Sequence, residues 1–134
     1  MNEWQLDSRL AADSVELGEH GSIQIRAIPA APWPWLILVP QYRRAVEWFD
    51  LPEPQQAQLF ELTMNLAAEL KSEFGADKIN IAAIGNVVAQ LHVHIVARHQ
   101  GDSAWPAPVW GKSYEPADEP AQAERLRRLR RVLG

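Results

Sequence analysis

The stretch Gln90-Leu91-His92-Val93-His94-Ile95-Val96-Ala97-Arg98 alternates in the way that predicts a β-strand. Its apolar residues at odd-numbered positions fall on one face, and the other face carries Gln90, His92, His94 and Val96. Because a strand rises about 3.3 Å per residue, we expect the two imidazoles roughly 7 Å apart on one side of a sheet. A strand with three consecutive polar side chains on one face needs a physical explanation.

Three interpretations of this polar face are open. It can be the solvent-exposed face of a half-exposed antiparallel strand. It can be part of a metal site, because two histidines two residues apart can present their nitrogens to one ion. The chain has no Cys, and the other histidines are His20 and His99, so carboxylates would have to complete such a site. The third interpretation is nucleophilic catalysis by an imidazole whose tautomer is fixed by its neighbours.

Length and charge limit the other possibilities. A chain of 134 residues is expected to form one domain, residues 1–134, large enough to bury its own core. Its net charge of −4 gives no general attraction for nucleic acid or a membrane surface, and we expect neither as a partner. We see no apolar run of membrane-spanning length and no signal peptide. With no Cys in the chain, we expect a cytoplasmic location.

The rest of the chain predicts an α+β protein. Leucines at helical spacing predict a long helix over 51–74, with prolines in its first turn and Gly75 at its end. A short helix or turn is expected within 1–17, and a second helix in the tail at about 118–134. Further strands are expected at 14–17, 22–28, 36–39 and 78–84. Trp33 and Trp35, in a proline-rich segment, are expected to close one end of the core.

The stretch from Gln90 to Val96 resembles the signature of the histidine triad (HIT) superfamily, His-φ-His-φ-His-φ-φ with φ apolar, with Gln90 in place of the first His. Segment 36–40 looks like the family strand that ends in proline. Gly85-Asn86 stands where the family has Gly-Gln, and Trp105-Pro106 looks like a tail segment that some members use near the site. The resemblance covers roughly residues 22–110, which we take as the core of the domain, and the chain looks like a small bacterial-type HIT-like hydrolase.

The resemblance implies a fold and a reaction. The fold would be an antiparallel sheet of about five strands with one long helix packed on it and a short C-terminal helix. The reaction would be hydrolysis or nucleotidyl transfer at a nucleoside α-phosphate, in a dinucleoside polyphosphate or a nucleoside phosphoramidate. It would proceed through a nucleotidyl-histidine intermediate. The family usually works as a homodimer and needs no cofactor, although Mg²⁺ often accompanies the substrate.

The resemblance also assigns roles to residues. His92 would be the nucleophile, with its tautomer fixed by a backbone carbonyl, and His94 would donate a hydrogen bond to phosphate. Gln90 would occupy the position of the first triad His without acting as an acid or base. The residues expected to bind substrate are Arg43, Asn80, Gly85, Asn86 and Trp105, and no metal ligand is expected. In the family, the loop equivalent to the one with Trp33 and Trp35 lies near the base-binding pocket, so the resemblance gives contact with a nucleobase as their alternative role. Arg43 and Val87 replace a family His and a family Ser or Thr that meet phosphate, so a binding module with little turnover remains an alternative.

Overall fold

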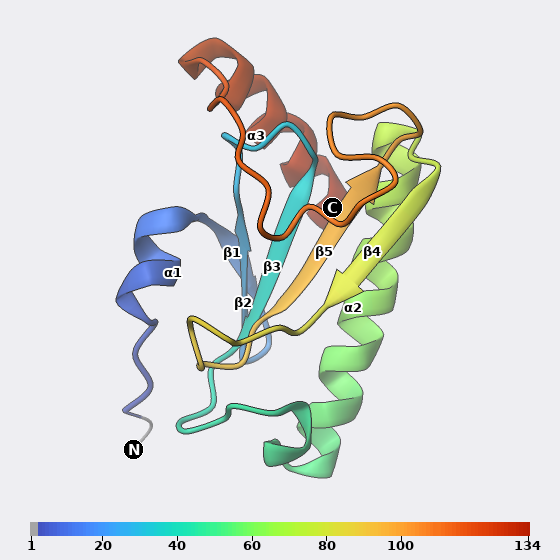
Figure 1. The fold of residues 1–134 in the computed structure, drawn as a ribbon. Helices are drawn as coiled ribbons and strands as arrows, with labels where there is room; N and C mark the ends of the chain where they lie inside the picture. Colours follow the sequence, from blue (N-terminus) through green and yellow to red (C-terminus); the bar gives the residue numbers. More distant parts are fainter. Residues whose placement is uncertain (1–2) are drawn as a thin grey trace.

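Five antiparallel strands form a single sheet in the order β1-β2-β3-β5-β4 in this computed structural model, which describes residues 3–134 (Figure 1). The strands are β1 (Val15–His20), β2 (Ile23–Ala27), β3 (Trp35–Pro40), β4 (Lys78–Ala82) and β5 (Val93–Arg98). The helices are α1 (Ser8–Asp13), the short 3-10 helix η1 (Trp48–Asp50), α2 (Glu53–Phe74) and α3 (Glu119–Leu133). The predicted α+β class, the antiparallel sheet, the long helix and the C-terminal helix are confirmed.

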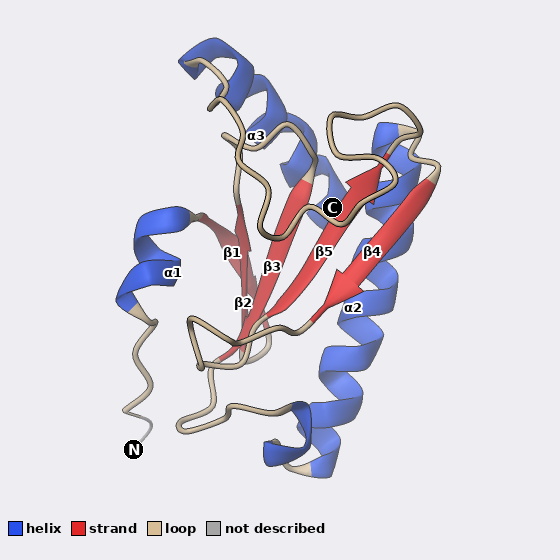
Figure 2. Cartoon of the chain, in the orientation of Figure 1, coloured by secondary structure: helices blue, strands red, loops and turns tan. Residues whose placement is uncertain are grey.

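The two faces of the sheet are covered differently, as the colouring by secondary structure makes plain (Figure 2). Helices α2 and α3 pack on one face over a core that includes Ile25, Leu38, Leu59 and Ile95. Helix α1 and the long loop between β5 and α3 lie on the other face, over a smaller cluster rich in tryptophan. Among residues 3–134, no helix combines the length and apolarity needed to cross a bilayer.

Helix α2 follows from its sequence. Pro52 is its N-cap and Pro54 lies in its first turn, where backbone N–H groups have no helical partner to lose. Leu59 and Leu70 on its inner stripe are fully buried. Gly75 ends the helix in the left-handed region, at φ 56°, where glycine lacks the steric cost of a side chain.

The strand that carries the histidines is shorter than predicted. We predicted a strand over 90–98, but β5 begins only at Val93. The N–H of Leu91 donates to the carbonyl of Ala45 rather than to a neighbouring strand, and β3 pairs with β5 only as far as Val93. His92 therefore lies in the approach to the strand and His94 within it.

The interpretation of a half-exposed strand is wrong. All six residues of β5 are buried, and His92 and His94 expose only 7% and 8% of their surfaces. The sheet is covered on both faces, so the polar face of this strand meets protein rather than bulk water. Trp33, 2% exposed, belongs to the cluster on the histidine side, as the core interpretation of that residue predicted.

Candidate active site

A cavity of about 370 Å³ lies on the histidine side of the sheet. Its wall is formed by α1, by Ile28 just after β2, by Ile37 of β3, by the turn before the histidines and by the loop after β5. The residues that line it are Arg9, Leu10, Asp13, Ile28, Ile37, Ile84, Gly85, Asn86, Val87, Val88, His92, His94, Trp110 and Gly111. The cavity therefore combines two imidazoles with a largely apolar wall, an arrangement typical of small-molecule sites.

His92 has one ring nitrogen engaged and one available. Its Nδ1 lies 2.7 Å from the backbone carbonyl oxygen of Gln90, which can only accept, so Nδ1 carries the proton. In the neutral ring Nε2 then holds the lone pair. This is the carbonyl contact that the family resemblance implied, and it prepares Nε2 for attack on an electrophile.

His94 has the opposite tautomer. The indole Nε1–H of Trp35 donates to His94 Nδ1 at 3.0 Å, so the proton of the neutral ring is on Nε2. Burial lowers the pKa of His94 to about 3, and the neighbouring charge of His92 contributes in the same direction. The two imidazole centroids are 4.8 Å apart, which is closer than the roughly 7 Å expected from the strand repeat. His94 is thus a neutral hydrogen-bond donor beside the candidate nucleophile.

The lowered pKa of His94 predicts a pH-dependent stability. In the unfolded chain this imidazole takes a proton near its ordinary pKa of about 6.5, whereas the folded protein keeps it neutral until about 3. The unfolded state therefore binds more protons between these values, and stability falls as the pH is lowered from 6.5. One proton corresponds to about 1.4 kcal/mol per pH unit.

Urea unfolding between pH 7 and pH 5 tests this prediction. The wild-type chain is expected to lose stability more steeply than His94→Phe, which keeps an aromatic ring beside Trp35 and Trp110 without a titrating group. The difference between the two slopes isolates His94 from the other titrating groups. Equal slopes in the two proteins would contradict a buried neutral imidazole.

Gln90 is not among the residues that line the cavity. Its Oε1 accepts from the backbone N–H of Asp7 at 2.8 Å, and its Nε2 donates to the carbonyl of Gln5 at 2.8 Å. Both partners belong to the N-terminal segment. The main chain of Gln90 contacts His92, while its amide holds a segment more than 80 residues away in sequence.

Three residues expected to bind substrate lie outside the cavity lining. Arg43 is on an exposed loop and forms an ion pair with Glu3 at 2.9 Å. Asn80 on β4 accepts from the guanidinium of Arg98, and that guanidinium lies 5.6 Å from the ring centroid of Trp105. Contact between these three residues and substrate stays a prediction.

Arg98 organises the loop that contains Trp105. It is 2% exposed and is held by Asp102 through Nε and a second guanidinium nitrogen at 2.8 and 3.0 Å. The bond to Arg98 holds the pKa of Asp102 well below its usual range, aided by backbone N–H groups of the loop and opposed by burial. This buried ion pair fixes the start of the loop that leads to Trp110.

The turn at Gly85-Asn86 lies beside the histidines, as the family resemblance implied. Gly85, with φ 68°, and Asn86 both line the cavity, together with Val87, whose side chain is largely exposed. Positive φ is the conformation that glycine adopts without steric cost, so a β-carbon at position 85 would strain this turn. His92, His94, Gly85 and Asn86 are the predicted site residues that the structure brings together.

Several residues around the histidines were absent from the predicted set of catalytic and substrate-binding residues. Trp35 donates to His94 from outside the cavity lining, and Trp110, which lines the cavity, has its ring centroid 5.5 Å from that of His94. Arg9, Leu10 and Asp13 bring α1 into the wall. A short helix and a proline-rich loop carry no periodic signal that points to a distant strand. Trp35, which was expected to precede the strand at 36–39, is the first residue of β3 and pairs with Val96.

The metal-site interpretation gains no support from the described part of the chain. Within residues 3–134, no three His, Cys, Asp or Glu side chains are grouped so that they could hold a metal ion. The Nδ1 atoms of His92 and His94 are both already engaged by protein groups.

Comparison with known proteins agrees with this geometry. The HIT domain family model matches residues 14–101. Three solved bacterial structures resemble nearly the whole chain. A histidine triad protein from Sinorhizobium meliloti 1021 is 45% identical, with 96% of each chain covered and a TM-score of 0.89. One from Bradyrhizobium japonicum is 44% identical, with 98% of each chain covered and a TM-score of 0.91.

The third is a histidine triad protein from Marinobacter aquaeolei VT8, 43% identical over 97% of this chain and 96% of that one, with a TM-score of 0.91. The search of curated proteins found no match. Family membership supports a nucleotide-binding or hydrolase-type function in general terms. The family match over most of the chain, together with the paired imidazoles in their cavity, identifies this protein as a member of the histidine triad (HIT) family.

Proposed function

We propose that this protein is a nucleotide hydrolase or nucleotidyl transferase that acts at a nucleoside α-phosphate through a nucleotidyl group on His92. The observation that carries the proposal is the 2.7 Å contact between His92 Nδ1 and the carbonyl of Gln90, which leaves Nε2 as the nucleophilic atom beside the cavity. The substrates that fit are a dinucleoside polyphosphate or a nucleoside phosphoramidate. We propose no required cofactor, although Mg²⁺ can arrive with a polyphosphate.

The reaction would take two displacements at phosphorus. The lone pair of His92 Nε2 forms a P–N bond, and the bond from phosphorus to the leaving oxygen or nitrogen breaks with its electron pair. A water oxygen then attacks phosphorus and loses a proton to solvent, the P–N bond breaks, and the electron pair of that bond returns to Nε2. Imidazole suits both steps because it is a good nucleophile and a good leaving group.

His94 would act without changing its charge. Its buried ring is neutral and its Nε2–H is free to donate, so it can stabilise a phosphate oxygen in the transition state. A fixed neutral donor strengthens this contact without consuming a proton from solvent.

Turnover distinguishes this proposal from a binding module. The purified protein is incubated with dinucleoside polyphosphates and with nucleoside phosphoramidates, and released nucleoside monophosphate is measured. Catalytic release of monophosphate is expected from at least one class. The engagement of the Gln90 amide by the N-terminal segment favours the second candidate, a nucleotide-binding protein with little turnover. Tight binding with no monophosphate released would establish that candidate.

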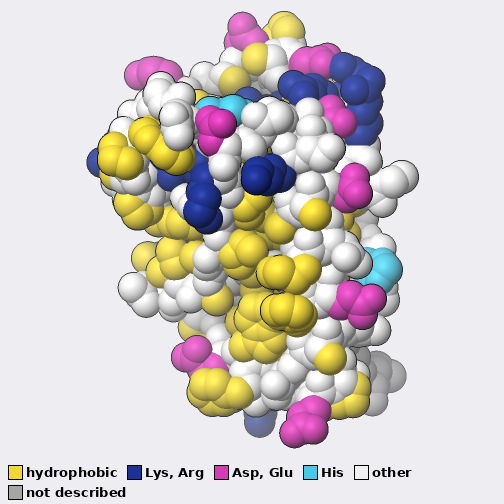
Figure 3. All heavy atoms as spheres, turned by 90° about the vertical axis from the view of Figure 1, so that its right-hand side faces the viewer, with side chains coloured by type: hydrophobic (Ala, Val, Ile, Leu, Met, Phe, Trp, Pro, Cys, Tyr) yellow, Lys and Arg dark blue, Asp and Glu magenta, His cyan; other side chains and the backbone are white. Residues whose placement is uncertain are grey.

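We also propose that the working form is a homodimer in the cytoplasm, with no nucleic acid or membrane as partner. The surface that fits a second copy lies on α2 and β4. Strand β4 is an edge of the sheet, and an exposed edge invites pairing with another chain. Beside it, exposed apolar side chains gather in the middle of the face drawn in Figure 3. Among the exposed apolar residues of α2 and β4 are Phe60, Met64 and Ile81.

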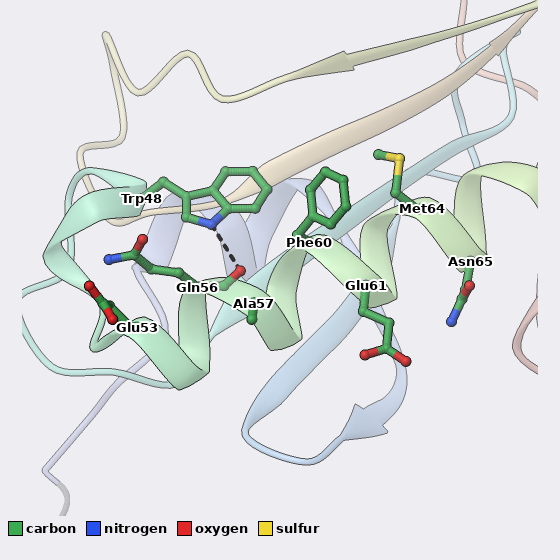
Figure 4. A pocket seen from close by; sticks show the side chains of 8 residues that line it. All are labelled: Trp48, Glu53, Gln56, Ala57, Phe60, Glu61, Met64 and Asn65. Carbon is green, nitrogen blue, oxygen red and sulfur yellow. Dashed lines mark hydrogen bonds between the residues drawn. The ribbon is translucent and has the colours of Figure 1, made fainter.

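A groove on α2 adds to this surface. It is lined by Trp48 of η1 and by Phe60, Glu61 and Met64 of α2, among others (Figure 4). The indole N–H of Trp48 donates to the backbone carbonyl of Gln56, and the Trp48 ring lies beside Phe60 in the groove (Figure 4). Apolar patches of this kind on a small protein mark interaction sites.

The dimer is tested by light scattering at tens of micromolar. Wild type is expected to have twice the chain mass of 15.1 kDa, and Phe60→Glu is expected to be a monomer because it puts a charge into the apolar surface. The matched control is Val15→Glu on β1, the opposite edge of the sheet, which should stay dimeric. A wild-type monomer, or a dimer unaffected by Phe60→Glu, would contradict this arrangement.

A further inference from the structure

We propose that Gln90 is a positioning residue that fixes the N-terminal segment, residues 3–14, as a wall of the substrate cavity, with Arg43 as a secondary anchor. The claim about the wall rests on the proposed function, because it assigns that wall to the non-phosphate part of a nucleotide. The claim about anchoring rests on contacts alone. Neither role involves proton transfer by Gln90.

The segment has little structure of its own. Residues 3–7 form no helix or strand, and α1 has only six residues, too few to be stable without tertiary contacts. Yet α1 supplies Arg9, Leu10 and Asp13 to the cavity wall, and Leu10 is 5% exposed. The shape of the cavity therefore depends on what holds this segment against the sheet.

Gln90 holds the start of the segment with both ends of its amide. Oε1 accepts the N–H of Asp7 and Nε2 donates to the carbonyl of Gln5, each at 2.8 Å. The amide therefore supplies the same acceptor and donor that the backbone of a neighbouring strand would supply to the N–H of Asp7 and the carbonyl of Gln5. Glu lacks the donor, so it would place a carboxylate against the carbonyl of Gln5. The amide of glutamine supplies both groups at one end of a flexible chain.

Asp7 connects this contact to α1. Its side chain caps the helix by accepting the N–H of Arg9 at 2.8 Å, and its carbonyl accepts the N–H of Ala11 at 3.0 Å. Fixing the main chain of Asp7 thus fixes the first turn of α1.

The far end of the segment is held by a buried arginine. Arg26 donates to the hydroxyl of Ser14 at 2.7 Å and to its carbonyl at 2.8 Å. Leu10, between the two anchors, packs in the tryptophan-rich cluster. The exposed ion pair between Arg43 and Glu3 holds the segment at a further point near its start, and by itself contributes little stability.

The two residues that stand where the family resemblance places histidines, Gln90 and Arg43, therefore both contact residues 3–7. The main chain of Gln90 orients His92, while its side chain holds the segment that forms part of the cavity wall. For a substrate that contacts both His92 and this wall, Gln90 would therefore set the position of the substrate relative to the nucleophile.

The experiment breaks the contact from each side separately. Gln90→Glu removes the donor, and Gln100→Glu, at an exposed position, is the control for the added charge. Asp7→Pro removes the N–H that Oε1 accepts; φ of −56° at this position suits proline. Asp7→Ala is its control, because both substitutions lose the cap and only proline loses the N–H.

The first measurement is hydrogen–deuterium exchange of the α1 amides. Exchange at Ala11 and Ala12 is expected to be at least about tenfold faster in Gln90→Glu than in wild type, and at least about tenfold faster in Asp7→Pro than in Asp7→Ala. The amides of β5 are expected to stay protected in all of these proteins. The Gln100→Glu control should exchange like wild type. Unchanged exchange in both Gln90→Glu and Asp7→Pro would overturn the anchoring.

The second measurement is calorimetric binding of AMP, GMP and inorganic phosphate. The affinity of the nucleotide that wild type prefers is expected to fall at least about fivefold in Asp7→Pro relative to Asp7→Ala, with phosphate unaffected. Faster exchange with unchanged nucleotide affinity would overturn the role of the wall. If wild type bound neither nucleotide, the proposed function and the role of the wall would both fail, and the exchange result would still decide the anchoring.

Discussion

Replacing His92 with alanine is expected to reduce monophosphate release by roughly 10⁴-fold or more, because the substitution removes the only proposed nucleophile. The structure gives the reason that this residue, rather than His94, attacks. The carbonyl of Gln90 fixes the His92 proton on Nδ1, so the lone pair is on Nε2. The bond from Trp35 fixes the His94 proton on Nε2, so its lone pair faces the indole.

His20→Ala is the matched control for His92→Ala, because His20 is an exposed histidine on β1 outside the cavity lining. It should retain wild-type rates. Near-ultraviolet circular dichroism and thermal melting would establish that His92→Ala is folded. A folded His92→Ala protein with activity within about threefold of wild type would refute nucleophilic catalysis by this residue.

Replacing His94 with alanine is expected to lower kcat by about 10²–10³-fold, the loss typical of removing one preorganised donor from a transition state. The substitution deletes the Nε2–H that would meet a phosphate oxygen and leaves His92 and its carbonyl partner in place. Because His94 is neutral down to about pH 3, the pH–rate profile of wild type should show no titration of this ring near neutrality.

Trp35→Phe tests how much of the effect of His94 depends on the bond from Trp35 that fixes the His94 proton on Nε2. It keeps an aromatic ring in the cluster but removes the bond to His94 Nδ1, so the proton can move to either nitrogen. We expect a loss of roughly tenfold or less, the equivalent of about one hydrogen bond. A larger loss in Trp35→Phe than in His94→Ala would contradict the assigned order of roles.

The sheet, the long helix and the histidine pair could be predicted from the sequence because each leaves a local pattern. Alternation predicts strands, and the leucine spacing of α2 predicts its buried stripe. Gly85 and Asn86 were singled out through the family resemblance, and they line the same cavity as the histidines, to which they are close in sequence.

The rest of the site depends on contacts between distant segments. The predicted strand ran three residues too far because nothing local shows that the N–H of Leu91 bonds to Ala45. Gln90 was assigned to catalysis by its position in a motif, yet its amide is engaged by residues 5 and 7. Trp110 and α1 enter the wall through tertiary packing, which no periodicity of a short loop or a six-residue helix reveals.

The most direct test of nucleotidyl transfer to His92 is to denature the protein rapidly in alkali during turnover and map the modified peptide by mass spectrometry. Alkali preserves the P–N bond of a phosphorylated imidazole, which acid breaks. The expected result is a peptide that carries one added nucleoside monophosphate group, with fragmentation that assigns the group to His92. A nucleotidyl group on any other residue, or turnover with no modified peptide when the quench precedes product release, would contradict the mechanism.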